Sequence, residues 1–296
     1  MLGKVLKNEW KGTYRIGCLM LIVLAGVTFL GWLAFQSPMW RELSSETYYS
    51  QDSFGASVLN LVSVFTLILY AIMLAAVAIG IIAYLGVRFY RTMYTDEGYL
   101  THTLPVTEGK LLFAKTFISG IWSLIVSLGI IVSVFALFAF MISALLPNGY
   151  SLSDFWWEAR NVYDDEIREI FEVFEDELGM NFRAYFIYMV VSLVLGSFTS
   201  IMTLFGAISM GQLFTKHRVL MAIVSYIGVS MVKGIFSSVI EGIVTNIYAM
   251  GNHHSAAVVG SYLNTNLVIS FVLSVLFAGL LYLASWLVNT RKLNME

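Results

Sequence analysis

The sequence predicts an all-α membrane protein with six transmembrane helices. Hydrophobic residues make up 58% of the 296 residues and charged residues only 12%, whereas soluble domains have about 25% charged residues. A helix needs about 20 apolar residues to cross the hydrocarbon core. Six runs are long enough, and they are continuous rather than alternating, which favours helices over barrel strands. The predicted spans are residues 16–35, 57–86, 117–146, 184–208, 219–248 and 267–288.

The N-terminal residues 1–15 predict an amphipathic helix that lies in the membrane interface. Apolar and aromatic residues recur there at four-residue steps: Leu2, Leu6, Trp10 and Tyr14. A second stripe, at steps of three or four, holds the bases Lys4, Lys7, Lys11 and Arg15. Such a helix turns its apolar face to lipid and its ammonium groups to anionic head groups. The alternative is a basic segment whose periodicity is accidental. Either way, the next apolar run is too long for a signal-peptide core and lacks a cleavage site.

The distribution of Lys and Arg predicts that both termini are cytoplasmic. Twelve bases precede the first span, lie within segment 87–116, lie between spans four and five or follow the last span. Only four lie in the segments on the other side. Because bases are enriched on the cytoplasmic side of a membrane, segment 87–116 is expected in the cytoplasm. The chain is then a multi-pass protein of the plasma membrane.

Segment 147–183, on the extracellular side, predicts an outer amphipathic helix. Ser151 and Asp154 have the spacing of a capping box, and apolar residues follow at steps of three and four among ten acids. The apolar face is expected to pack on the spans, on a second copy or on lipid, while the acidic face could capture a cationic ligand. The acids lack the spacing of a calcium loop. Neighbouring His253 and His254 point apart on regular structure, so no metal site is expected.

Lys233 lies inside the fifth predicted span, where an ionisable residue is expensive and commonly functional. Glu241 is eight residues away, about 12 Å along the helix and about 80° around it, so the two are not expected to pair. Lys233 then either extends to the outer interface or bonds another helix, or it lines a substrate path. The path interpretation places its walls on spans two and five. Its residues would be Ser225, Ser230, Lys233 and Ser237.

The chain carries no recognisable catalytic or nucleotide-binding motif. A phosphate-binding loop requires Gly-x-x-x-x-Gly-Lys-Ser/Thr. The nearest string, residues 104–111, has Gly109 and Lys110 but neither the first Gly nor the final hydroxyl. No Ser, His and Asp order suggests hydrolysis. The protein is therefore not expected to be an enzyme or to bind nucleic acid, and no cofactor is expected in this chain.

Segment 87–116 is predicted to be a cytoplasmic loop with its own local structure. Gly98 suits a turn or a helix end, and Pro105 disfavours helix at Leu104. Thr107 can cap a helix that begins at Glu108, where an acid in the first turn complements the helix dipole. A solvated connection between two spans would show the same pattern.

The motif in this loop resembles a known family of membrane proteins. Asp96-Glu97-Gly98 is followed by Thr103-Leu-Pro-Val-Thr107 and by Lys115 as the next helix begins. This pattern is similar to the loop of type-2 ATP-binding-cassette (ABC) exporter permeases of bacteria. The chain departs from it at Tyr99, where Thr is common, and in a shorter interval before the Pro. The six spans with both termini inside extend the resemblance over the whole chain.

The resemblance implies a permease that exports a substrate by alternating access. Its partners would be a second permease half, membrane lipids and two cytoplasmic ATPase subunits that hold ATP and Mg²⁺. A hydrophobic or cationic peptide is one expected substrate, and drugs, lipids, polysaccharides and ions are alternative substrates. The alternatives are a membrane sensor or scaffold without transport, and an ion-coupled secondary transporter. The latter needs a buried acid, and no predicted span places one at its middle.

The resemblance also implies how the ATPase is contacted. A short coupling helix within residues 92–104 would dock on it, and the connection at 211–218 would be a lesser contact. Met93, Tyr94, Tyr99 and Leu104 are expected to project as docking side chains. The coupling residues implied are Arg88, Arg91, Met93, Tyr94, Asp96, Glu97, Gly98, Tyr99, Leu104, Pro105, Lys216 and Arg218.

Overall fold

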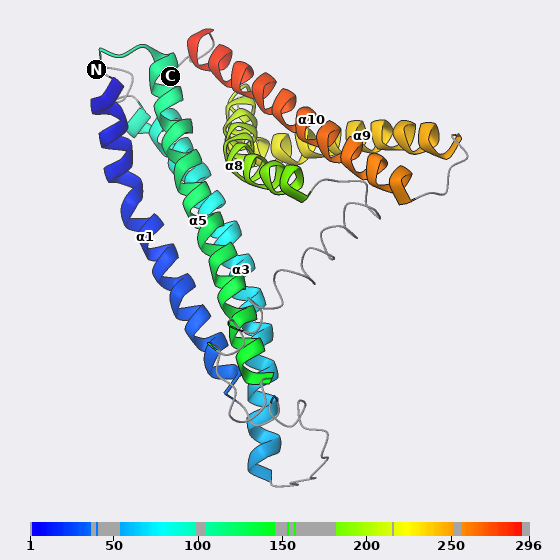
Figure 1. The fold of residues 1–296 in the computed structure, drawn as a ribbon. Helices are drawn as coiled ribbons and strands as arrows, with labels where there is room; N and C mark the ends of the chain where they lie inside the picture. The colour runs from blue at the N-terminus through cyan, green and yellow to red at the C-terminus, as the bar shows by residue number, and fades with distance from the viewer. Residues whose placement is uncertain are drawn as a thin grey trace. The chain divides into compact units, whose positions relative to one another are not determined.

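The fold comes from a computed structural model that describes residues 2–36, 40, 54–98, 105–145, 153, 157, 182–214, 216–250 and 256–291. Within these residues there are six long helices and no strand, and each helix is long and apolar enough to cross a membrane (Figure 1). The prediction of an all-α protein with six spans is confirmed. The helices are α1 (Leu2–Ala34), α3 (Phe54–Tyr94), α5 (Glu108–Leu145), α8 (Phe182–Gly211), α9 (Arg218–Met250) and α10 (Ala256–Arg291).

Residues 2–15 are helical, as predicted, but they continue directly into the first span. α1 runs without interruption from Leu2 to Ala34. The reason is local: the segment has no Pro, and a Gly such as Gly12 weakens a helix by only about 1 kcal/mol. The side chains of Glu9 and Thr13 are also buried against other helices, so this end of α1 packs on protein.

The start of α5 agrees with the prediction from its capping residues, whereas the lengths of α3 and α5 differ from the prediction based on hydropathy. α5 begins at Glu108, as Thr107 predicted, and the amides of Lys110 and Leu111 donate to the Thr107 carbonyl at 2.9 and 3.2 Å. The second and third spans were expected at 57–86 and 117–146. The helices α3 and α5 extend beyond those bounds to Tyr94 and Glu108, because nothing in the polar flanks ends a helix sooner.

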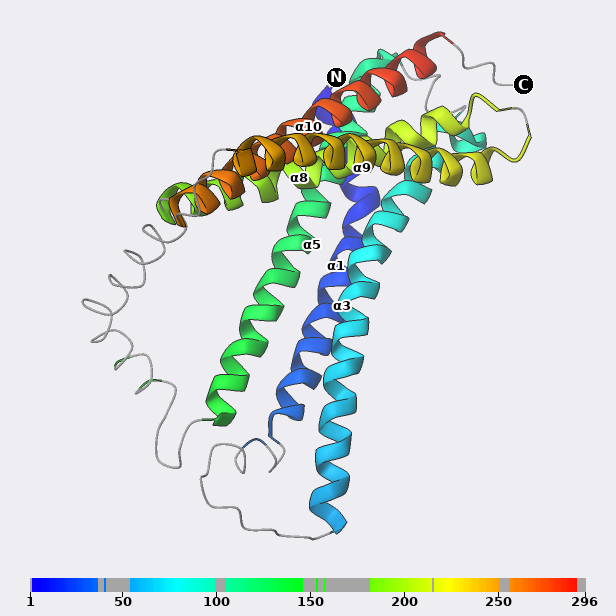
Figure 2. The same ribbon diagram turned by 90° about the vertical axis from the view of Figure 1, so that its right-hand side faces the viewer.

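The described residues group into two compact units. The first unit draws on Met1–Thr13, Ala83–Leu124 and Ile167–Glu296, and the second on Tyr14–Ile82 and Ile125–Glu166. In the first unit α8 packs against both α9 and α10, and the three helices lie side by side in both views (Figures 1 and 2). This three-helix group is the scaffold of the candidate site.

Aromatic and polar contacts attach the C-terminal part of α3 to that group. Phe89 stacks on Phe205 of α8, with ring centroids 3.9 Å apart and the rings nearly parallel. The Tyr94 hydroxyl lies 2.7 Å from the Ser209 hydroxyl and donates to Asn289 Oδ1 of α10 at 2.8 Å. The end of α3 is therefore fixed to both α8 and α10.

Close approach of α8 and α10 depends on Gly206. A Cβ at this position would lie 2.6 Å from the Cβ of Leu281 and 2.8 Å from its carbonyl oxygen. We expect Gly206→Ala to force the helices apart and to lower the free energy of unfolding by about 1–3 kcal/mol. Thermal unfolding of the detergent-solubilised protein measures this loss. The matched control is Gly228→Ala on α9, where a Cβ meets no atom within 4 Å and better helix propensity should stabilise by up to about 1 kcal/mol. Equal effects of the two changes would contradict the packing described here.

Candidate functional site

A polar groove in the first unit is the candidate functional site. It encloses about 620 Å³ within the group formed by α8, α9 and α10, which is within the usual size range of ligand pockets. All of its lining residues belong to membrane-spanning segments. They are Tyr188, Ser192, Gly196, Thr199, Ser200, Thr203, Tyr226, Ser230, Lys233, Gly234, Ser237, Ser270, Phe271 and Ser274.

The groove forms where polar stripes of neighbouring helices meet. On α8 the lining residues from Tyr188 to Thr203 recur at steps of mostly three or four, and on α9 those from Tyr226 to Ser237 do the same. That spacing places each set on one helix face. Most other residues of these two helices are apolar, so much of their hydroxyl content gathers along the shared face.

Lys233 is the charged residue of the groove. It is the sixteenth of the 33 residues of α9, so about 22 Å of helix separates it from Arg218 and about 25 Å from Met250. Because α9 is about 50 Å long and the hydrocarbon core only about 30 Å thick, extension of Lys233 to the outer interface stays a prediction beside its place in the groove. Its ammonium makes no hydrogen bond or ion pair with the described residues, and the nearby acid Glu241 accepts a hydrogen bond from Ser270 at 3.2 Å instead. An unpaired ammonium at this depth requires water or an anion in the groove.

Three hydroxyls of α8 differ from those of α9 in their hydrogen bonding, whereas Ser192 of α8, like the α9 serines, bonds none of the described residues. On α8, Thr199, Ser200 and Thr203 donate their hydroxyl protons to main-chain carbonyls of their own helix at 2.7–3.1 Å. Because a hydroxyl has one proton, these side chains present only oxygen lone pairs to the groove. On α9, Ser230 and Ser237 make no hydrogen bond with the described residues, so they keep a proton to donate alongside Lys233.

A second polar feature of the first unit is a charged cluster that joins α1, α3 and α5. Glu9 Oε1 accepts a hydrogen bond from Lys115 Nζ at 2.7 Å, and Glu9 Oε2 pairs with Arg88 Nη2 at 3.2 Å. Lys115 Nζ also donates to Thr92 Oγ1 at 2.8 Å, and Arg88 Nη1 donates to the Gly12 carbonyl at 2.7 Å. The Lys115 and Glu9 side chains are only 4% and 10% exposed. One carboxylate therefore holds three helices together.

A cavity of about 500 Å³ borders this cluster. Residues of α1, α3 and α5 form part of its wall, and the loop between α3 and α5 contributes Glu97, Pro105 and Val106. Since the charged groups of the cluster bond one another, the cavity holds fewer uncommitted groups than the groove. We regard it as the junction between the N-terminal helix and the loop.

The structure corrects two of the predicted docking residues. Met93 is fully buried, and the Tyr94 hydroxyl bonds Ser209 and Asn289. Both point into the first unit because α3 remains helical to Tyr94 and turns this face to α8 and α10. Residues 96–98 are helical, and Gly98 is required there because a Cβ would lie 2.6 Å from the Met93 carbonyl.

The other coupling residues occupy three different settings. Asp96 is exposed, and Arg91 pairs with Glu97 at 3.3 Å with both side chains more than half exposed. Arg88 belongs to the charged cluster, and Pro105 is exposed at the edge of the adjoining cavity. Lys216 and Arg218 are exposed in the connection between α8 and α9. Tyr99 and Leu104 lie outside the described residues, as does the whole of segment 99–104 of the predicted coupling helix.

Three of the four predicted path residues line the groove. Ser230, Lys233 and Ser237 share one face of α9, whereas Ser225 is not part of the lining. Span two (α3) contributes no residue to this groove, whose walls come from α8, α9 and α10, and its place in the wall of a substrate path stays a prediction. The part of α3 beyond the predicted span instead packs on other helices, because Phe89 stacks on Phe205 and Arg88 pairs with Glu9. The stripe of hydroxyls from Ser192 to Thr203 was missed, although its helical spacing is visible in the sequence.

The outer segment and the adjacent histidines remain predictions. Residues 147–181 lie outside the described residues except Ser153 and Trp157, which are helical and exposed. His253 and His254 also lie outside them. The predicted amphipathic outer helix is therefore not described.

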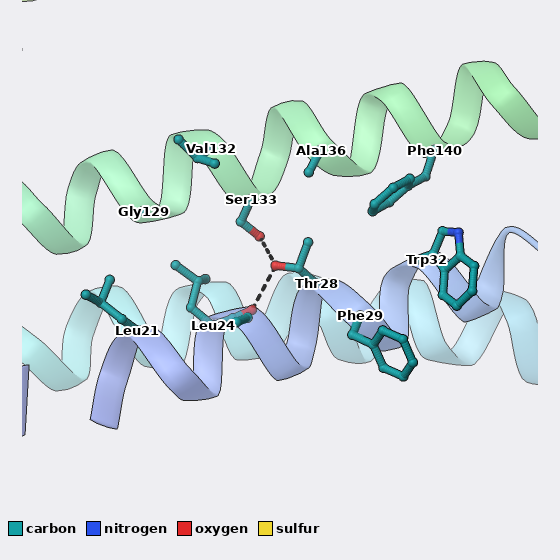
Figure 3. A pocket seen from close by; sticks show the side chains of 11 residues that line it. Leu21, Leu24, Thr28, Phe29, Trp32, Gly129, Val132, Ser133, Ala136 and Phe140 are labelled. Carbon is teal, nitrogen blue, oxygen red and sulfur yellow. Dashed lines mark hydrogen bonds between the residues drawn. The ribbon is translucent and has the colours of Figure 1, made fainter. Parts of the chain in front are cut away.

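The second unit contains a cavity of a different character. It measures about 620 Å³ between α1 and α5, and apolar side chains such as Leu24, Phe29 and Phe140 line most of it (Figure 3). Its polar groups bond one another, because the hydroxyls of Thr28 and Ser133 are 2.6 Å apart and Tyr70 lies 2.7 Å from Ser133. These bonds join α1, α3 and α5, so we regard them as packing.

Comparison with protein-family models, with curated proteins and with solved structures finds no match for this chain.

Proposed function

We propose that this chain is the permease subunit of an ATP-driven exporter of the bacterial plasma membrane, with both termini in the cytoplasm. A partner ATPase binds ATP and Mg²⁺ and supplies the energy. A second permease half completes the path, and the substrate moves outward by alternating access. The resemblance of the loop at Asp96–Thr107 to type-2 ABC permeases supplies the transporter class.

The observation that carries the proposal is the polar groove with Lys233 at the middle of α9. A purely structural or scaffolding bundle gains nothing from an unpaired ammonium among hydroxyls at this depth, where ionisable groups are costly. Substrate paths are the usual setting of such residues. The groove lining holds a base and no acid, and the acid at its border, Glu241, bonds Ser270 about 12 Å along α9 from Lys233.

The loop around Arg91 and Glu97 is the proposed ATPase contact. Asp96, Arg91 and Glu97 are exposed on its surface. The neighbouring Met93 and Tyr94 are anchored to α8 and α10. A force applied to the loop is therefore transmitted to the helices that form the groove.

This contact predicts that an ATPase is recovered with the full chain from its native membranes in mild detergent. We expect a protein with a phosphate-binding loop to co-purify and to hydrolyse ATP. Glu97→Arg should reduce the recovered ATP hydrolysis several-fold, because charges at an interface set orientation and association. Purification followed by an ATP hydrolysis assay measures both quantities.

Two variants separate docking from loop stability. The swap Arg91→Glu with Glu97→Arg keeps the internal ion pair but reverses both charges, so it should remain defective. Lys11→Gln removes an exposed charge on the same predicted side but outside the loop, so it should behave as the wild type. Recovery of the chain without any ATPase would instead favour a sensor or scaffold.

A further inference from the structure

We infer that the groove of α8, α9 and α10 binds an anionic head group, a phosphate or a carboxylate, that also carries hydroxyl groups. The inference rests on the proposed function, because it names the class of substrate for the same groove. Its source is a lipid head group or a free anion, and the chemistry recognised is the same in both cases.

The anionic part follows from Lys233. Its ammonium lies half-way along α9, lines the groove and has no partner among the described residues. Ser230 and Ser237 lie one turn on either side of it and keep their hydroxyl protons. Three donors on one face, one of them charged, match the oxygens of a phosphate or carboxylate.

The hydroxyl part follows from the opposite wall. The hydroxyl groups of Thr199, Ser200 and Thr203 donate hydrogen bonds to main-chain carbonyls. Ser274 of α10 also donates to a main-chain carbonyl, at 2.9 Å. These oxygens can only accept hydrogen bonds. Alcohol groups next to the anion can donate to these oxygens, so a ligand that carries hydroxyl groups fits this wall of the groove.

The same arrangement disfavours the cationic peptide expected from the sequence. A cation placed beside Lys233 would face its ammonium, and the acid that bonds a lining residue, Glu241, lies about 12 Å farther along α9. Two like charges held in the same groove repel each other strongly where water is scarce. The acidic outer segment, residues 147–183, suggested a cationic substrate, but none of its described residues lines the groove.

The test measures binding to the purified full chain without any partner. The soluble probe is glycerol 3-phosphate, and the lipid probe is phosphatidylglycerol in phosphatidylcholine nanodiscs. Methyl phosphate lacks the alcohol groups, and choline is the cationic comparison. Calorimetry or the shift of the thermal midpoint gives the dissociation constants. We expect glycerol 3-phosphate or phosphatidylglycerol to bind, methyl phosphate to bind more weakly and choline not to bind.

The variants assign the binding to the groove. Lys233→Met should weaken binding of the anionic probes about tenfold or more, because a hydrogen bond to a charged group is lost. Lys233→Arg should retain most of the affinity. Thr203→Val should remove part of the preference for glycerol 3-phosphate over methyl phosphate. Lys110→Met, an exposed lysine outside the groove, should change nothing.

The outcomes separate the sources and the two proposals. Binding of the soluble probe alone indicates a free anion, and binding of the lipid alone indicates a head group. The inference is overturned if Lys233→Met binds as well as the wild type, if choline binds better than the anions, or if neither anionic probe binds. Because no ATPase takes part, such a failure leaves the recovery of a partner ATPase unaffected.

Discussion

Replacing Glu9 by alanine is expected to lower the free energy of unfolding by about 3 kcal/mol, the largest loss we predict for a single side chain. The Glu9 carboxylate pairs with Lys115 at 2.7 Å and with Arg88 at 3.2 Å. Without it, the Lys115 ammonium stays buried at 4% exposure with no opposite charge. The midpoint of thermal unfolding in detergent measures the effect.

Companion variants show whether the loss comes from the unpaired charge. Glu9→Leu combined with Lys115→Met removes the carboxylate and its more buried partner and should recover much of the stability, because the remaining base, Arg88, is 23% exposed and still bonds the Gly12 carbonyl. Glu97→Ala breaks an exposed pair and should cost less than about 1 kcal/mol. If Glu9→Ala and Glu97→Ala unfold at the same midpoint, the charged cluster does not hold the three helices together.

The membrane spans could be predicted because hydropathy reports which residues suit lipid. The start of α5 could also be predicted, since Thr107 and Glu108 signal a helix start within a few residues. The ends of α3 and the continuity of α1 could not. Whether a helix continues into a polar flank depends on what it packs against, and for Tyr94 the partners Ser209 and Asn289 are more than 100 residues away.

Some residues of the candidate site could likewise be predicted from the sequence, and others could not. Lys233 was identifiable because a charge within an apolar run is unusual, and Ser230 and Ser237 share its helix face. The role of Glu9 was missed, although it is the one acid before residue 42. Its partners lie on other helices, and periodicity along one helix carries no information about contacts between helices. Met93 and Tyr94 were assigned to the wrong side for the same reason.

A thiol at position 237 is expected to react with a membrane-impermeant methanethiosulfonate reagent at least about ten times faster than a thiol at position 235. Ser237 lines the groove, whereas Ile235 is 63% exposed on α9 and not part of the lining. The two residues differ by about 3 Å in height along the helix, so depth does not separate them. The nucleophile is the thiolate, and only a water-filled groove allows it to form and meet the reagent.

This accessibility measurement tests the central claim most directly, because it needs neither the substrate nor its identity. Cys18 is first replaced by serine, and Ser237→Cys and Ile235→Cys are then compared in native membranes, with and without ATP and vanadate. The account predicts fast labelling at 237, slow labelling at 235, and a change in the rate at 237 when the nucleotide is trapped. Equal, slow labelling at both positions in every condition would show that the groove is not a path for a polar substrate and would contradict the account.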